Sequence, residues 1–112
     1  MIHNEARAIR ERLAAIDGVK SVTRGWPRRL DVLPVIALHK SSDVPVDLRD
    51  DREHVAELEY TIRIFTERAE DADAIAVEVD AVMENLGYVR TFSYDDDAQD
   101  VRMDALRYRK YV

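Results

Sequence analysis

Hydrophobic residues recur at helical spacing in two stretches of the chain. In residues 2–18, IHNEARAIRERLAAIDG, they return at steps of three and four, which lines them along one face of a helix that can end at Gly18. A second helix is predicted over residues 66–87, because its first turns carry carboxylates and Gly87 closes it. The predicted core stripes are Ile2, Ala6, Ile9, Leu13 and Ile16 in the first helix, and Ala72, Ile75, Val79, Val82 and Leu86 in the second.

Strand patterns fill most of the remaining sequence. Residues 19–25 form a short predicted strand before a turn at Pro27, and residues 33–40, LPVIALHK, are almost wholly apolar. Such a run indicates a central strand that is covered on both faces. Residues 56–65 alternate strictly, which is typical of a strand with one wet face. Its predicted inward residues are Leu58, Tyr60, Ile62 and Ile64.

The C-terminal part of the chain predicts a hairpin. Residues 88–94 and 101–112 are its strands, and DDDAQD at 95–100 is its acidic turn. The alternation shifts between Met103 and Leu106, so we expect a bulge near Ala105. Residues 41–53 are expected to be a polar loop between two strands.

The predicted order of elements is α-β-β-β-α-β-β, without an internal repeat, a linker or a break in composition. This order predicts an α+β fold in which two helices pack on one face of a largely antiparallel sheet, and residues 1–112 form a single domain. The fold class alone does not indicate a function.

Composition restricts the possible functions. The 112 residues include no cysteine, which excludes disulfides and thiolate metal sites in this chain, and the net charge is −6. A surface dominated by acidic residues disfavours broad binding of nucleic acid or anionic membranes. The sequence shows no signal peptide and no hydrophobic stretch of membrane-spanning length, so a soluble protein made in the cytosol is expected.

A metal site is one interpretation of the loop at 41–53. His39 and His54 flank it, and the aspartates nearby could supply oxygen ligands. The spacing matches no known metal motif, so a solvated loop is the favoured interpretation. Similarly, DDDAQD lacks the glycine and glutamate of a calcium-binding loop. The aspartates considered as ligands are Asp43, Asp47, Asp50 and Asp51.

Enzymatic motifs do not stand out. No serine lies in a nucleophile elbow, and no glycine-rich loop could hold a phosphate. We therefore predict no catalytic residue, no cofactor and no metal, and no enzyme activity.

Arginine and tryptophan are concentrated in TRGWPRR, where Arg24, Arg28 and Arg29 surround Trp26. These residue types are enriched at the centres of protein interfaces. Two alternatives stay open at this point: Trp26 could fill the core, or the segment could stack on nucleic acid. Val77 is a further interface candidate, because it lies opposite the core stripe of the second helix.

The chain as a whole resembles the small tail-completion and tail-terminator proteins of long-tailed bacteriophages. The likeness covers nearly the whole chain, from the N-terminal helix through LPVIALHK, a polar loop and EYTIRIFTERAEDADAIAVEVDAVMENLGYVRTFSYDDD to the closing ALRYRKY. It is strongest where the strand YTIRIFT is followed by the helix DAIAVEVDAVMENLGY and then by RTFS. It implies a virion structural protein that forms a ring, typically a hexamer, on the tail tube and joins it to the head. The implied partners are copies of itself, the tail-tube protein and a head-completion or connector protein, with DNA only as passing cargo. The implied location is the virion tail, or the host cytoplasm during assembly.

In such a ring the loop at 41–53 is expected to be an arm that reaches a neighbour or the tube. Charge can set the register of a head-to-tail interface. We expect Arg24, Arg28 and Arg29 to face acidic residues of another copy, namely Asp95, Asp96 and Asp97 or Asp47, Asp50 and Asp51. The alternative function is a small ligand-binding or regulatory α+β domain that acts as a dimer.

Overall fold

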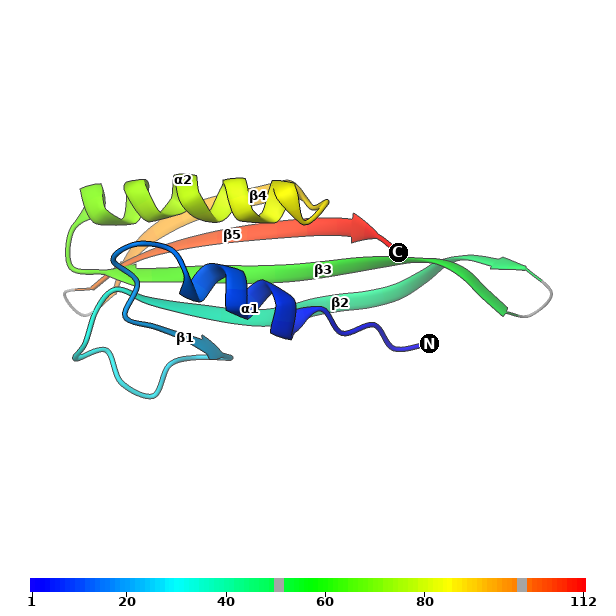
Figure 1. The fold of residues 1–112 in the computed structure, drawn as a ribbon, viewed down its shortest axis with the longest axis horizontal. Coiled ribbons are helices and arrows are strands. Elements are labelled where there is room, and N and C mark those ends of the chain that lie inside the picture. The colour runs from blue at the N-terminus through cyan, green and yellow to red at the C-terminus, as the bar shows by residue number, and fades with distance from the viewer. Residues whose placement is uncertain (50–51, 99–100) are drawn as a thin grey trace.

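The computed structural model describes residues 1–49, 52–98 and 101–112, except for the side chains of Glu53, His54 and Ala98. Two helices and five strands follow one another in the predicted order, which confirms the α-β-β-β-α-β-β pattern (Figure 1). The elements are α1 (Ala6–Ala14), β1 (Ser21–Arg24), β2 (Val35–Arg49), β3 (Arg52–Thr66), α2 (Ala69–Asn85), β4 (Val89–Ala98) and β5 (Val101–Tyr111).

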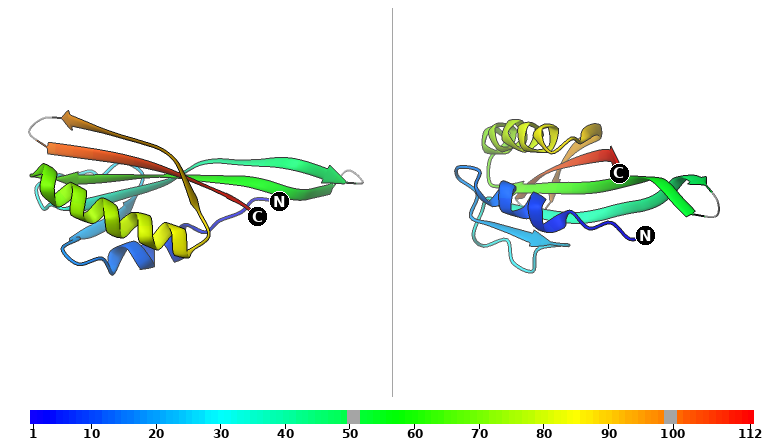
Figure 2. Two further views of the ribbon diagram at one scale, coloured as in Figure 1. Left: turned by 90° about the horizontal axis from the view of Figure 1, so that it is seen from above. Right: turned by 45° about the vertical axis from the view of Figure 1, so that its right-hand side comes forward.

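The five strands form one sheet in the order β1-β2-β3-β5-β4. Only β1 and β2 are parallel, and the other pairs are antiparallel, so the predicted α+β class is confirmed. The short β1 and the longer β4 are the two edges of the sheet. Both helices lie on the same side of it, as the view from above shows (Figure 2).

The main core lies between the helices and the sheet. The inward side chains of β3 are fully buried, as the alternation predicted, and Ile9 and Leu13 of α1 pack on the same core. Ile2 was wrongly placed in the first helix: α1 begins only at Ala6, and Ile2 is 85% exposed. In α2 the buried stripe ends with Met83, four residues after Val79, whereas Val82 and Leu86 are only partly buried.

A second, smaller cluster lies on the opposite face of the sheet. Val35 and Ala37 of β2 pack there with Phe65, and Leu30 and Leu33 cover them. The start of β2 is therefore covered on both faces, as the apolar run predicted. The cover comes from the chain's own segment between β1 and β2, so this strand needs no neighbouring molecule to bury it.

The prediction of a loop at 41–53 is wrong, because β2 continues to Arg49 and β3 begins at Arg52. The two strands pair as an antiparallel hairpin that projects beyond both helices and gives the molecule its 52 Å length (Figure 1). Val44 and Val46 favour extended backbone, and Pro45 is accommodated between shifts of register. We call residues 41–57 the arm; its register shifts lie between Lys40 and Ser42, Pro45 and Asp47, and Asp47 and Leu48.

Two predictions for the C-terminal hairpin are also wrong. The aspartates at 95–97 belong to β4 and pair with β5, where Arg102 forms an ion pair with Asp95, and residues 99–100 of the predicted turn lie outside the described residues. Pairing of β5 is regular through Ala105, and the register shift lies instead in β4, between Arg90 and Phe92. Within the described residues, neither helix is long and apolar enough to cross a membrane.

Candidate interaction surfaces

The two histidines of the metal hypothesis are not neighbours in the sheet. His39 lies opposite Thr61, which is seven positions from His54 along β3, or roughly 23 Å at strand spacing. The described residues include no group of three or more potential metal ligands. Asp50 and Asp51 lie outside the described residues, so the structure does not test them as ligands.

Asp43, at the base of the arm, binds the N-terminal segment through hydrogen bonds. Its carboxylate accepts hydrogen bonds from the backbone N–H of His3 at 2.7 Å and from His3 Nδ1 at 3.1 Å. These bonds lower the pKa of Asp43 to about 2, with a smaller contribution from Lys40. Lys40 Nζ also donates to the carbonyl of His3 at 2.7 Å. Asp43 therefore has a structural partner within the chain.

On the side of the sheet opposite the helices, residues 25–34 cover the start of β2 and the end of β3. The rest of this side is exposed to solvent, and we call it the open face. Along β3 and β5 it presents alternate residues, because every second side chain points away from the helices. Its exposed or half-buried members from these strands are Glu57, Glu59, Arg63, Arg107, Arg109 and Tyr111, and Val89, Phe92 and Tyr94 extend it onto β4.

Three arginines on the open face each lie against an aromatic ring. The guanidinium of Arg63 is 4.5 Å from the ring centre of Trp26. The corresponding distance is 5.4 Å from Arg107 to Phe92 and also from Arg109 to Tyr111. Such cation–π contacts attract the guanidinium groups to the rings. The face thus presents amphipathic arginine–aromatic pairs, residue types that are enriched among those that dominate binding energy at protein interfaces.

Trp26 does not fill the core. Its side chain is 65% exposed and contacts Phe65 with ring centres 6.0 Å apart. The tryptophan therefore lies at the margin of the second cluster, between apolar cover and solvent, where it is available to a partner.

The charges of the open face are only partly compensated within the chain. Arg107 pairs with Glu59 at 3.5 Å, whereas Arg63 and Arg109 have no carboxylate partner among the described residues. Arg63 instead lies 2.9 Å from His39 Nδ1, and its own Nε is buried without a hydrogen-bond partner in the described part of the chain. Burial of the imidazole is the main cause that lowers the pKa of His39, and the positive charges of Arg63 and Arg107 lower it further. A neutral imidazole is thus able to accept the Arg63 hydrogen bond.

Arg24, Arg28 and Arg29 line a hollow of about 450 Å³ beside Trp26 and Val35. Arg28 and Arg29 are exposed and form no ion pair with any described residue. The structure thus brings Arg28 and Arg29 together with Trp26 at the margin of the open face. Arg24 also borders this hollow, but it is on the same side of β1 as the buried Val22, so its side chain faces α1. The arginines are free to pair with another molecule, which stays a prediction.

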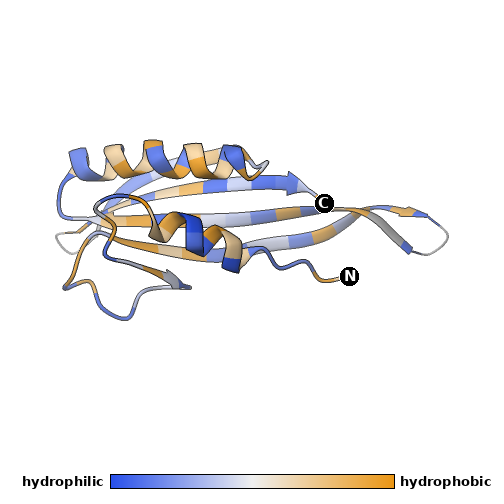
Figure 3. Cartoon of the chain, viewed as in Figure 1, coloured by the Kyte–Doolittle hydropathy of each residue, from blue (hydrophilic) through white to orange (hydrophobic). Residues whose placement is uncertain are grey.

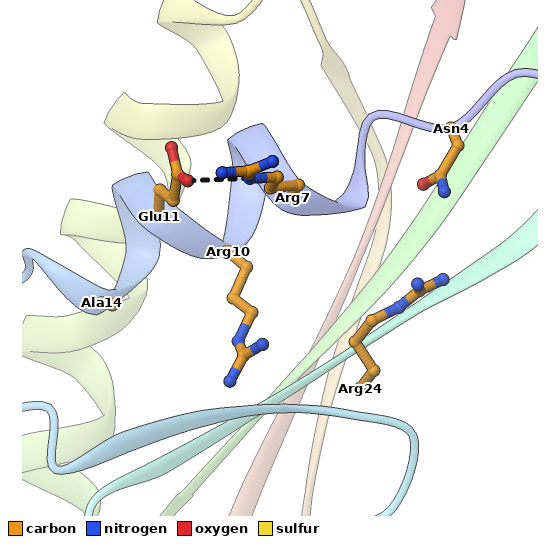
Figure 4. A pocket seen from close by; sticks show the side chains of 6 residues that line it. All are labelled: Asn4, Arg7, Arg10, Glu11, Ala14 and Arg24. Atoms are coloured by element: carbon orange, nitrogen blue, oxygen red, sulfur yellow. Dashed lines mark hydrogen bonds and ion pairs between the residues drawn. The ribbon is translucent and has the colours of Figure 1, made fainter.

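A second basic hollow, of about 400 Å³, lies between α1 and Arg24 (Figure 4). Arg10 points into it, and the Arg10 Nε–H donates to the carbonyl of Val22 at 3.1 Å. Arg7, on the outer side of the helix, pairs with Glu11 at 3.2 Å. These groups are largely exposed, so the hollow is a solvated surface rather than an enclosed ligand site.

The predicted acidic partners lie elsewhere on the molecule. Asp95 pairs with Arg102, which also binds Asp104 at 2.9 Å, and Asp47 pairs with Arg49 at 3.6 Å. Asp96 and Asp97 form no ion pair with the described residues, although Asp96 accepts the backbone N–H of Asp97. Pairing of any of these residues with arginines of a second copy stays a prediction.

Val77 is 68% exposed on the outer side of α2, as predicted from the helical pattern. The helix contains no lysine or arginine, and its exposed side is acidic. Sequence reasoning missed the open face itself. The signal was present in the last strand, where Arg107, Arg109 and Tyr111 alternate with the buried Leu106 and Tyr108.

The comparisons with known proteins agree with this fold. No protein-family model and no curated protein matches the sequence. Among solved structures, the chain is similar to a chain of the "Virion of native gene transfer agent (GTA) particle", with a TM-score of 0.70 and 15% sequence identity. The match covers 93% of this chain and 90% of that one, so the two share one fold over nearly their whole length.

Proposed function

We propose that this protein is a structural subunit of a phage-like virion, of the tail-terminator or tail-completion type. In this role, copies of the chain form a ring, a hexamer by analogy with such proteins, that closes the tail tube and offers a surface to the head. The subunit acts through its contacts and catalyses no reaction.

The fold match is the observation that carries this proposal. It spans 93% of this chain and 90% of the matched chain, which comes from the virion of a gene transfer agent particle. The sequence resemblance to tail-completion proteins supports the same role independently of that match.

The shape of the molecule supports a part in an assembly. Its arm exposes Val44, Val46 and Leu48, which are 50%, 50% and 64% exposed. Figure 3 shows hydrophobic stretches, in orange, along the projecting hairpin. A projecting strand pair with exposed apolar residues is suited to contact a neighbour or the tail tube. The net charge of −6 also suits a conduit through which DNA must slide without being held.

The proposal is tested with tail tubes built from the tube protein of the same particle. Addition of this protein should stop tube growth, and electron microscopy should show a ring at one tube end. Native mass spectrometry of the capped end complex gives the number of copies. A protein that neither binds tubes nor alters their length, and instead forms a dimer stabilised by a small metabolite, would contradict the proposal and support the ligand-binding alternative.

A further inference from the structure

We infer that the outer side of α2 in one copy of this chain docks on the open face of the next copy. The inference rests on the proposed ring and names the surfaces that join its subunits. The contact would place a helix on the side of the sheet that lacks one, with the acidic, valine-centred surface of α2 against the arginine–aromatic pairs.

The outer side of α2 has the composition of a docking surface. Glu70, Val77 and Glu84 are spaced seven residues apart, so they lie almost in line along the helix. Val77, at the centre of this line, is the most exposed large hydrophobic residue of the helix. Asp73 and Glu84 form no ion pair with the described residues, and Glu70 has only an exposed partner, Arg68, at 3.5 Å. The helix therefore presents an apolar centre between carboxylates of which Asp73 and Glu84 have no ion-pair partner among the described residues and Glu70 has only an exposed one.

The open face offers the complementary groups. Arg63 and Arg109 have no carboxylate partner within the described chain, while Phe92 is 49% exposed and Tyr111 is 56% exposed. A carboxylate that approaches a ring-stacked guanidinium meets its free N–H edge, and an isopropyl group such as that of Val77 can pack on the adjacent ring. The two surfaces are thus opposite in charge and alike in having apolar centres.

The dimensions of the two surfaces agree. Residues seven apart on a helix are separated by about 10 Å, and the full α2 is about 26 Å long at 1.5 Å per residue. Arg63 is level with Ala105 in the register, so Arg63 and Arg109 are four residues apart along the strands, or about 13 Å. Asp73 and Glu84 lie on either side of Val77 and are eleven residues, or about 16 Å, apart along the helix, so they come within side-chain reach of both arginines.

The position of the two surfaces explains why the contact would repeat. They lie on opposite sides of the sheet, because α2 covers one face and the open face is the other. A contact between two different surfaces is head-to-tail, so each added copy leaves one surface of each kind unoccupied until a ring closes. A second copy is consequently the partner that supplies the required chemistry at the required place.

Disulfide crosslinking tests the contact directly, because the chain has no native cysteine. Val77→Cys protein is mixed with Phe92→Cys protein, with tail tubes present, and oxidised. Both positions are exposed, so neither substitution should disturb the fold. We expect a disulfide-linked heterodimer at least fivefold above that of a control mixture of Val77→Cys and Arg7→Cys, in which the second cysteine lies on α1. A protein with both Val77→Cys and Phe92→Cys should give a ladder of linked copies.

The outcomes separate this inference from the proposed function. Rings on tubes without the Val77–Phe92 crosslink would overturn the inference and leave the function standing. Crosslinking of Arg28→Cys with Asp96→Cys in rings that lack the Val77–Phe92 crosslink would identify the segment after β1 and the edge strand β4 as the interface instead. The Val77–Phe92 crosslink in a protein that never caps a tube would support the contact and contradict the terminator role.

Charge exchange provides a second readout. Arg109→Glu should weaken the concentration-dependent self-association at least tenfold, as measured by analytical ultracentrifugation. A mixture of Arg109→Glu protein with Glu84→Arg protein should restore pairing between the two variants. Equal association of Arg109→Glu and wild-type protein, with no recovery in the mixture, would overturn the inference.

Discussion

At the scale of single residues, side chains at one end of the open face contact one another in series. Trp26 lies against Arg63, and Arg63 in turn contacts His39. Contacts of this kind restrict an arginine side chain before it binds a partner, which reduces the further loss of side-chain entropy on binding. Preorganisation of Arg63 is therefore expected to contribute to binding, in addition to its charge.

The lowered pKa of His39 leads us to expect that the stability of the protein depends on pH. Its pKa in the folded protein is lowered from the usual 6.5, so the unfolded chain binds more protons below pH 6.5. The free energy of unfolding contributed by this group is present above pH 6.5 and is lost as the pH falls through the lower folded value. Urea unfolding at a series of pH values should show a smaller loss on acidification for His39→Gln than for the wild type. Identical slopes would contradict this assignment.

We expect that substitution of Ile62 by a charged residue strongly lowers the free energy of unfolding. It is fully buried on the helix side of β3, so Ile62→Asp places an unpaired charge in the core. We expect a cost of about 5 kcal/mol or more, which is comparable with the whole stability of a small domain. Circular dichroism should show an unfolded or largely unfolded chain. The control, Ile62→Val, should fold and lose only about 1 kcal/mol; a native melting temperature for the aspartate variant would contradict the core assignment.

At the scale of elements, regular hydrophobic patterns predicted the helices and the strands that pack on the core. They did not predict the strands of the arm. The alternation of β3 from Leu58 to Ile64 and the stripe of α2 from Ala72 to Val79 are set by burial in one core. The strands of the arm have no such core. Their pairing extends a hairpin that the body already fixes, and the polar residues around Asp47 give a periodicity signal that cannot be distinguished from a loop. The same reason explains why Asp95, Asp96 and Asp97 were placed in a turn.

We expect that removal of the tip of the arm impairs assembly and leaves folding intact. Replacement of residues 46–55 by Asn-Gly would close β2 and β3 with a two-residue turn next to the Pro45–Ala56 pair. The core residues of the body are all retained, so the melting temperature should change by less than about 5 °C, equivalent to about 1 kcal/mol. Tube capping should be lost. Thermal unfolding and the tube-length assay measure the two effects, and a shortened protein that still caps tubes would remove the arm from the proposed function.

At the scale of the whole molecule, the distribution of charge matters more than its sum. The net charge is −6, yet Arg28 and Arg29 lie together beside Trp26 at the margin of the open face, and α2 lacks any basic residue. Sequence alone could identify these clusters because they are contiguous in the chain. It could not identify the Arg63, Arg107 and Arg109 pairs as one surface, because their proximity depends on the register of β3 with β5.

Charge reversal at Arg28 and Arg29 tests the role of this distribution. The double variant Arg28→Glu with Arg29→Glu should fold normally, since exposed charge changes rarely cost more than about 0.5 kcal/mol each. Ring formation on tubes should fall at least tenfold. The matched control, Arg7→Glu with Arg12→Glu, makes the same change of charge on exposed positions of α1 and should assemble normally. Loss of folding in the first variant would instead give these arginines a structural role.

The bulges of the long hairpin have a mechanical consequence. All three interruptions of the β2–β3 ladder occur at or beyond Lys40, while the pairing from Val35 to Lys40 is continuous. Each such interruption bends the strand and increases its local twist, whereas a continuous ladder keeps the strands regular. The register shifts therefore set the direction in which the arm leaves the sheet, so their removal would redirect the arm without altering the packed core.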